Sequence, residues 1–203
     1  MIDASLRRWS APPVELVARL ARRVGLAPAA LTSAGLMLGL GAAAAAGSTR
    51  WTLALVLWIA SRIADGLDGA VARLGTPSPL GGFLDIVADF TVYGAFVVGV
   101  AVGVPDARLA AVVLLCTYYV SGAAFLAWSS LVHQRARQRL VHDDDRSIRF
   151  VGGLAEGFET IVAYVAICIW PGEAAVICWV FAAMVAFTAG QRVWFAARDL
   201  AER

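Results

Sequence analysis

Two pairs of aspartates stand close together in the sequence, and each pair is spaced to share one face of a helix. Asp65 and Asp68 are three residues apart, and Asp85 and Asp89 are four apart. Residues 75–79 between the pairs contain two prolines and a glycine, which end helices. At about 1.5 Å per residue, the pairs lie at matching depths of about 8–9 Å and 13–14 Å from this turn. We therefore expect four carboxylates to face one another across two consecutive antiparallel helices.

These carboxylates occur in a chain that is 60% hydrophobic and only 16% charged. Because one carboxylate at the middle of a bilayer costs about 2.5–3.5 kcal/mol, four of them need compensation. The chain contains no lysine, and Arg62 and Arg73 are too few to neutralise four acids. Mg²⁺ prefers oxygen ligands and is often shared between carboxylates and substrate phosphates. The sequence therefore predicts a site in which a pair of divalent cations binds a diphosphate.

Glycines flank the acids at Gly66, Gly69, Gly81 and Gly82. Small residues at such positions either leave room for a bulky ligand or allow helices to pack closely. For any one of them the two interpretations are equally good. Their joint position beside the aspartates favours room for a ligand.

Apolar stretches of about 20 residues, the length needed to cross a bilayer, recur along the chain. We predict six transmembrane helices, at residues 31–48, 51–72, 80–104, 107–131, 151–170 and 173–197. The connections at 47–50 and 171–172 are so short that the two helices on either side of each must run antiparallel. The expected fold class is an all-α polytopic membrane protein, with a cytoplasmic N-terminal segment at 1–30 and a six-helix domain at 31–203.

Residues 11–26 combine apolar side chains and arginines at helical spacing, which is typical of an amphipathic helix lying at a membrane surface. A solvated charged face is the alternative. The first 30 residues are charged rather than apolar, so we expect no cleavable signal peptide. With six spans, most arginines fall on the side of the two termini, and only Arg50 and Arg108 fall in loops on the other. The positive-inside rule therefore predicts cytoplasmic termini and a cytoplasm-facing aspartate cluster.

The pattern Asp65-x2-Asp68-Gly69-x2-Ala72-Arg73-x7-Gly81-x3-Asp85-x3-Asp89 resembles the signature of the CDP-alcohol phosphatidyltransferases. The resemblance implies transfer of a phosphatidyl group from a CDP-linked lipid, usually CDP-diacylglycerol, to an alcohol with release of CMP. It also implies phospholipid synthesis in a bacterial-type cytoplasmic (inner) membrane and a homodimer. Nucleic acid is not an expected partner.

The resemblance assigns roles to these residues. It implies that Asp65, Asp68 and Asp85 bind two Mg²⁺ or Mn²⁺ ions. Asp89 would complete the metal site and act as general base. The nucleotide would be lined by residues from the same signature, namely Gly69, Ala72, Arg73 and Gly81.

A weaker match precedes the first span. The family often has Pro-Asn-x-x-Thr there, and this chain reads Pro28-Ala29-Ala30-Leu31-Thr32. Thr32 either donates a hydrogen bond at the nucleotide site or simply caps the helix.

Features that bear on the alcohol point in two directions. Arg146 and Arg149 in the expected loop 133–149, and Arg192 near the end of the last span, could bind a phosphorylated polyol such as glycerol 3-phosphate or inositol phosphate. Arg192 resembles an arginine of family members whose acceptor carries a phosphate. Contacts with anionic lipid, or extension to the interface, are the alternatives. Glu156 and Glu159 could instead hold the ammonium group of serine or choline, or simply suit a helix dipole. Free inositol is also open as an acceptor.

Two unrelated classes of membrane protein also place acids within the bilayer. An intramembrane prenyltransferase grips a diphosphate through Mg²⁺, but its Asp-rich motifs usually lie on widely separated helices. A metal- or proton-coupled transporter would line a path with acids. Acids that reach half-way from one side argue against such a path.

Overall fold

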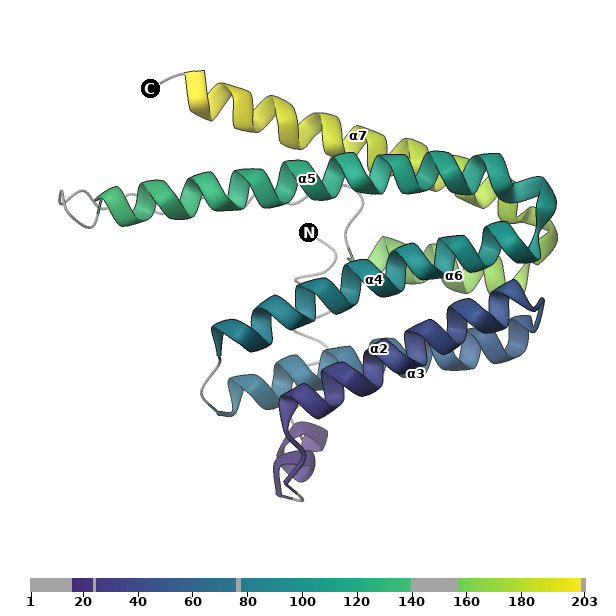
Figure 1. Ribbon diagram of the computed structural model, residues 1–203, viewed down its shortest axis with the longest axis horizontal. Helices are drawn as coiled ribbons and strands as arrows, with labels where there is room; N and C mark the ends of the chain where they lie inside the picture. The colour runs from purple at the N-terminus through teal and green to yellow at the C-terminus, as the bar shows by residue number, and fades with distance from the viewer. Residues whose placement is uncertain (1–15, 24, 76–77, 140–156, 202–203) are drawn as a thin grey trace.

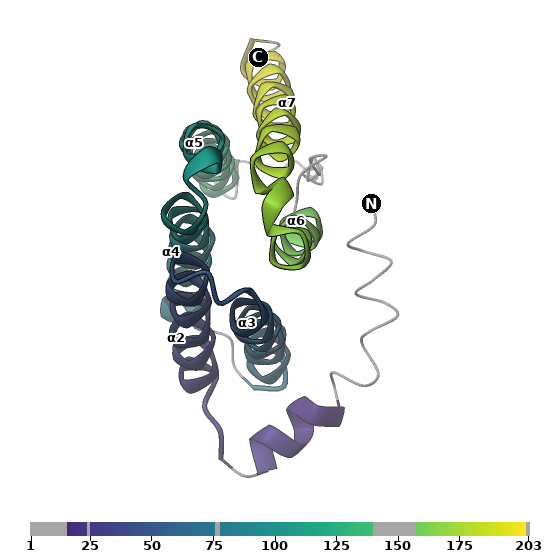
Figure 2. The ribbon, with the colours of Figure 1, turned by 90° about the vertical axis from the view of Figure 1, so that its right-hand side faces the viewer.

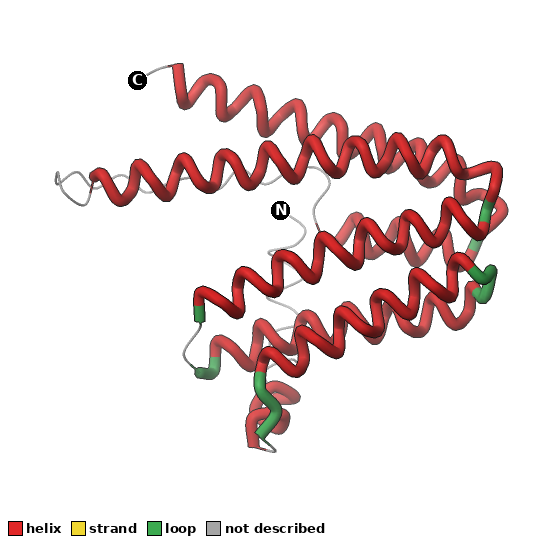
Figure 3. Tube along the Cα trace, viewed as in Figure 1, coloured by secondary structure: helices red, strands yellow, loops and turns green. Residues whose placement is uncertain are grey.

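The computed structural model describes residues 16–23, 25–75, 78–139 and 157–201. In these ranges the regular structure is helical throughout (Figure 3), which confirms the predicted all-α class. The helices after the short helix at 16–23 are α2 (Pro28–Gly47), α3 (Trp51–Arg73), α4 (Pro79–Gly103), α5 (Arg108–Arg139), α6 (Gly157–Ile169) and α7 (Ala174–Ala201). Short 3₁₀ turns, η1 (Pro105–Ala107) and η2 (Pro171–Glu173), precede α5 and α7.

The helix that carries the second aspartate pair begins for local reasons. Pro79 is the first residue of α4, where a missing N–H costs nothing and the fixed φ suits a helix. Ser78 is the N-cap residue, and its side-chain oxygen accepts a hydrogen bond from the backbone N–H of Gly81 at 3.0 Å. The turn therefore sets where α4 starts, and with it the depth of Asp85 and Asp89.

The helices form one bundle in which sequence neighbours run in opposite directions (Figure 1). α2 packs along both α3 and α4, α5 packs along α7, and α6 contacts α3 and α7. The starts of α2, α4 and α6 and the ends of α3, α5 and α7 lie at the same end of the bundle. Figure 2 shows the helix of residues 16–23 lying across the bundle axis at this end. Ala18 packs there against Ala70 and Val71 of α3.

Each predicted span corresponds to a helix, although the boundaries differ. Four of the described helices, α2, α4, α5 and α7, are long and apolar enough to cross a membrane. α6 is apolar but has 13 residues, and α3 carries Arg62, Asp65 and Asp68 within its length. The prediction of a loop from residue 133 is wrong in part, because α5 continues to Arg139. Residues 133–139 contain arginine and glutamine but no glycine or proline, and these residues favour helix.

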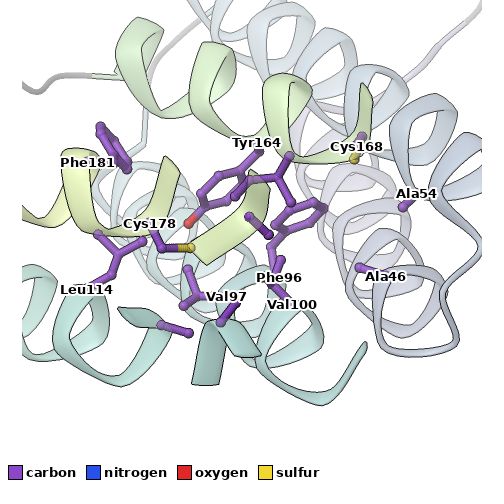
Figure 4. Packing of buried hydrophobic residues seen from close by; sticks show 14 of the residues in the cluster. Ala46, Ala54, Phe96, Val97, Val100, Leu114, Tyr164, Cys168, Cys178 and Phe181 are labelled. Carbon is purple, nitrogen blue, oxygen red and sulfur yellow. The ribbon is translucent and has the colours of Figure 1, made fainter. Parts of the chain in front are cut away.

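Aromatic side chains fill the core beneath the aspartates. Trp58 of α3 lies 5.3 Å from Phe96 of α4 and 4.8 Å from Tyr164 of α6, measured between ring centres. The rings of Phe96 and Tyr164 stack at 4.4 Å (Figure 4). The Tyr164 hydroxyl donates to the backbone carbonyl of Tyr93 at 2.9 Å and lies 3.1 Å from the hydroxyl of Tyr118 on α5. This cluster joins α3, α4, α5 and α6 at one level.

Glycines bring α2 and α4 unusually close together. A Cβ atom added at Gly99 would collide with the carbonyl oxygen of Ala43, and one at Gly103 would collide with that of Ala46. Only glycine allows backbones to approach this closely, as is common between membrane helices. The contact fixes α4 against α2, and the aspartates of α4 are positioned with it.

Candidate active site

The two aspartate pairs face each other from the end of α3 and the beginning of α4, as the sequence predicts. Asp65 interacts electrostatically with both Asp85 and Asp89, and Asp85 interacts with Asp68. Asp68 is buried, whereas the side chains of Asp65 and Asp89 are 32% and 30% exposed. The site therefore has one sheltered carboxylate and others that are open to a ligand.

Thr32 of α2 supports the buried aspartate. Its hydroxyl is 2.6 Å from Oδ2 of Asp68 and donates a hydrogen bond to it. The same hydroxyl lies 3.1 Å from the carbonyl oxygen of Pro28, one turn earlier. The alternative that Thr32 caps the helix is wrong, because α2 begins at Pro28 and its N-cap residue is Ala27. Thr32 lies in the second turn and faces α3.

Arg62 of α3 lies among the acids. Its Nη1 donates to Oδ1 of Asp89 at 2.7 Å and is 3.7 Å from Oδ2 of Asp65. The same nitrogen donates to the hydroxyl of Tyr93 at 3.2 Å. In the sequence, the signal for this role is the three-residue spacing between Arg62 and Asp65, which places both on one helix face.

The chemical type of the potential ligands in this site, carboxylate oxygens, suits a hard divalent cation. Carboxylates supply only oxygen ligands, which suit Mg²⁺ and Mn²⁺. Within the described residues, however, no three His, Cys, Asp or Glu side chains converge on one point as they stand. Thr32 and Arg62 instead hold Asp68 and Asp89 in hydrogen bonds. The carboxylates would therefore have to change rotamer before three of them could bind one cation.

The glycines beside the acids are not helix contacts in the part of the chain that the structure describes. A Cβ atom added at Gly66 or Gly82 would meet nothing within 4 Å. One at Gly69 would come within 3.3 Å of Nη1 of Arg73, and one at Gly81 within 3.0 Å of the Ser78 hydroxyl. These positions therefore support the interpretation of room for a ligand.

Two open pockets lie where the helix of residues 16–23 crosses the end of α3. One, of about 300 Å³, includes Ala72, a predicted nucleotide contact, together with Arg22 and Pro28. The other, of about 450 Å³, is lined by Arg19, Arg22, Arg23 and Leu74. Arg73, in the last turn of α3, is exposed. The end of α3 beyond the aspartates is therefore both accessible and rich in arginine.

The predicted acceptor residues are only partly within the described chain. Arg192 lies between α7 and α5, where its Nη1 donates to the hydroxyl of Ser121 at 2.9 Å. Its guanidinium carbon is 5.3 Å from the ring centre of Phe125. Glu159 lies in the first turn of α6, as expected. Arg146, Arg149 and Glu156 lie outside the described residues.

A sequence model of the family described as CDP-alcohol phosphatidyltransferase matches residues 25–194. The chain belongs to this family. The match spans all four aspartates and most of the bundle, so the protein is an enzyme of the CDP-alcohol phosphatidyltransferase class. The prenyltransferase and transporter alternatives are therefore set aside.

Relatives of this CDP-alcohol phosphatidyltransferase share its length and its fold. The inner membrane protein YnjF of Escherichia coli (strain K12) is 34% identical over 197 residues, which are 96% of this chain and 94% of YnjF. Crystal structures of phosphatidylinositol phosphate synthase (PgsA1) from Mycobacterium tuberculosis also resemble it. The complex with manganese and citrate gives a TM-score of 0.73 at 21% identity and covers 90% of this chain and 88% of that one. The structure with CDP-DAG bound gives the same score and identity and covers 90% and 92%.

Proposed function

We propose that the protein transfers a phosphatidyl group from CDP-diacylglycerol to an alcohol and releases CMP. The observation that carries this proposal is the meeting of two aspartate pairs from α3 and α4, at the spacing of the family signature. The similar fold of PgsA1, which has been solved with CDP-DAG bound, supports the choice of donor.

In this proposal Asp65, Asp68 and Asp85 are the core ligands of the divalent cations and Asp89 completes the metal site. Mg²⁺ or Mn²⁺ are the candidate ions, and two is the expected number. A fold relative was solved with manganese, which supports metal use. When bound, such ions supply positive charge for the diphosphate and the departing CMP. Thr32 holds Asp68 in place through its hydrogen bond, so the buried ligand is oriented before metal arrives.

The protein's own residues then position the two substrates and move one proton. We assign the nucleotide to Gly69, Ala72, Arg73, Thr32 and Gly81. The acceptor oxygen attacks the phosphorus that carries diacylglycerol, and a new phosphorus–oxygen bond forms. The phosphorus–oxygen bond to CMP breaks, and CMP leaves. Asp89 accepts the proton of the attacking hydroxyl, since a carboxylate at the open side of the site is within reach of it.

The acceptor that we favour is a phosphorylated polyol, such as glycerol 3-phosphate or inositol phosphate. Arg192 supports it, because a guanidinium held by Ser121 and Phe125 of α5 is oriented to donate hydrogen bonds to a phosphate group. Serine, choline and free inositol are the competing acceptors.

We also propose that all six helices, α2 to α7, cross the membrane, with residues 1–30 as a separate segment at its surface. The aspartates then lie towards the cytoplasm, at the end of the bundle that carries Arg19, Arg22, Arg23 and Arg73. The name of YnjF supports an inner-membrane location. A homodimer belongs to the same proposal.

Purified protein in detergent, supplied with CDP-diacylglycerol, tests the function directly. CMP release is measured with glycerol 3-phosphate, inositol phosphate, inositol, serine and choline, with Mg²⁺, with Mn²⁺ and with EDTA. The expected result is metal-dependent CMP release that rises with one acceptor, together with the matching phospholipid. If the protein releases no CMP from CDP-diacylglycerol with any of the five acceptors, in Mg²⁺ or in Mn²⁺, the proposal is refuted.

A further inference from the structure

The helix of residues 16–23 presents three different faces at the end of the bundle. One face packs against α3, where Ala18 is fully buried. A second face is apolar and exposed, and it carries Leu16, Val17 and Leu20. The third face carries Arg19, Arg22 and Arg23. Because residues three and four apart share one face of a helix, the three arginines gather beside the apolar face and not within it.

An arginine pocket of about 450 Å³ borders this third face, and it is lined by Arg19, Arg22, Arg23 and Leu74. Its volume lies within the range of about 300–1,000 Å³ that is typical of sites for small ligands. Within the described residues no acid lines this pocket, and neither Arg22 nor Arg23 forms an ion pair with an acid. Clustered guanidinium groups suit a phosphate, because each can donate two parallel hydrogen bonds to its oxygens. The arginine pocket therefore has the chemistry of a phosphate site.

Neither proposed substrate accounts for a phosphate in the arginine pocket. Leu74 lies about 9 Å beyond Asp68 along the helix axis, so a diphosphate held by the aspartates ends short of the pocket. The part of the donor that could extend this far is the nucleoside, which carries no charge of its own. The acceptor phosphate is assigned to Arg192 of α7, and Figure 2 shows α7 and the helix of residues 16–23 at opposite edges of the bundle. A third molecule is therefore needed to supply the phosphate.

The exposed apolar face of the same helix indicates the source of this phosphate. The exposed fractions of Leu16, Val17 and Leu20 are 63%, 46% and 52%. When such a helix lies in a membrane surface, its apolar face enters the acyl boundary and the arginines beside it lie at the level of the lipid phosphates. A free phosphate gains nothing from the apolar side chains, whereas a phospholipid contacts both faces.

We propose that the arginine pocket binds the headgroup phosphate of an anionic phospholipid that is neither the donor nor the product of the reaction. The inference rests on the membrane-surface position of residues 1–30 in the proposed function and on no particular acceptor. Arg22 also lines the neighbouring pocket that includes Ala72, a proposed nucleotide contact. The bound lipid thus holds the helix of residues 16–23 against α3, beside the nucleotide.

Native mass spectrometry of the full chain in detergent measures this binding lipid by lipid. The protein is titrated with dioleoylphosphatidylglycerol, which is anionic, and with dioleoylphosphatidylcholine, which carries no net charge. The test variant is Arg19→Gln/Arg23→Gln, which leaves Arg22 in place beside the nucleotide. The control is Arg50→Gln/Arg108→Gln, which removes the same charge from exposed arginines at the opposite end of the bundle. Thermal unfolding in detergent confirms that each variant is folded.

The Arg19→Gln/Arg23→Gln variant should bind its first phosphatidylglycerol about 10–30-fold more weakly than the wild type, because two of the arginines that face the lipid phosphate are gone. Its affinity for phosphatidylcholine should stay near that of the wild type. The Arg50→Gln/Arg108→Gln control should match the wild type for both lipids. With Mn²⁺ and CDP-diacylglycerol added, one protein molecule should carry CDP-diacylglycerol and phosphatidylglycerol at the same time, because the two sites are separate.

Wild-type phosphatidylglycerol affinity in the test variant, or an equal loss of affinity in the control, would overturn the inference. Displacement of phosphatidylglycerol by CDP-diacylglycerol would assign the pocket to the donor, and displacement by an equal concentration of inorganic phosphate would assign it to a free anion. Either result also overturns the inference.

Should the double variant fail to fold, Arg23→Gln alone decides. A loss of about 3–5-fold in phosphatidylglycerol affinity supports the arginine pocket as a lipid site, and unchanged affinity contradicts it. None of these measurements involves CMP release. A wild-type protein that releases no CMP therefore refutes the proposed function, while the lipid titration still decides whether the arginine pocket binds an anionic phospholipid.

Discussion

Thr32 and Asp68 lie 36 residues apart in the sequence and are joined by a 2.6 Å hydrogen bond between α2 and α3. Asp68 is 5% exposed, so this hydroxyl supplies a polar contact that bulk water cannot readily replace. The contact links the helix before the signature to a carboxylate within it.

Replacing Thr32 with valine should weaken metal binding. Valine has the shape of threonine without the hydroxyl, so Asp68 loses its orientation and not its packing. A hydrogen bond to a charged group contributes about 1.5–3 kcal/mol, so the Mn²⁺ concentration for half-maximal CMP release should rise about 10-fold or more. Thr32→Ser keeps the hydroxyl and should remain near the wild type. Equal Mn²⁺ dependence for valine and serine would show that the bond has no functional role.

The four aspartates should divide into two functional groups. Asp89→Asn should reduce turnover by about 100-fold or more, the usual contribution of a general base, while nucleotide affinity changes little. Asp68→Asn should instead weaken metal-dependent nucleotide binding, because it removes charge from a predicted ligand. Calorimetric titration with a CDP nucleotide, with and without Mn²⁺, separates the two effects. Equal losses of nucleotide affinity in both variants would contradict this division of roles.

The close contact between α2 and α4 should be sensitive to a single methyl group. Gly99→Ala places a Cβ against the backbone carbonyl of Ala43, and such overpacking costs about 1–3 kcal/mol. Gly94→Ala, on the same helix, meets nothing within 4 Å and is the matched control. Alanine also favours helix over glycine by about 1 kcal/mol, so the control should unfold at the same or a slightly higher temperature. A thermal midpoint for Gly99→Ala as high as that of Gly94→Ala would mean that α2 and α4 are further apart.

Arg192 should distinguish phosphorylated from neutral acceptors. If Arg192 binds the acceptor phosphate, Arg192→Gln should raise KM for glycerol 3-phosphate or inositol phosphate by about 10-fold. This is the change expected from losing one hydrogen bond to a charged group. KM for CDP-diacylglycerol should not change. Arg198→Gln is the control. Arg198 lies further along α7, is exposed, and its guanidinium lies over the ring of Trp194. An unchanged KM for every phosphorylated acceptor would remove Arg192 from the site.

The aspartate pairs could be predicted from the sequence because their position depends on local quantities. Helical spacing places each pair on one face, and the breakers at 75–79 set equal depths on both sides of the turn. The contacts that organise the acids could not be predicted in this way. The bond from Thr32 to Asp68 and that from Arg62 to Asp89 depend on how α2, α3 and α4 pack, and this packing rests on contacts such as Gly99 against Ala43. The last residue of α5 could not be predicted either, because an apolar pattern shows where a helix leaves the hydrocarbon and not where the helix ends.

The central claim is that carboxylates from α3 and α4 bind the divalent cation that engages the CDP-lipid. Anomalous diffraction from crystals grown with Mn²⁺ and CDP-diacylglycerol measures this most directly. We predict a manganese peak between α3 and α4, coordinated by Asp65, Asp68 and Asp85 and absent from crystals of Asp68→Asn. A protein preparation that releases CMP, yet gives crystals with bound nucleotide and no manganese between these helices, would contradict the account.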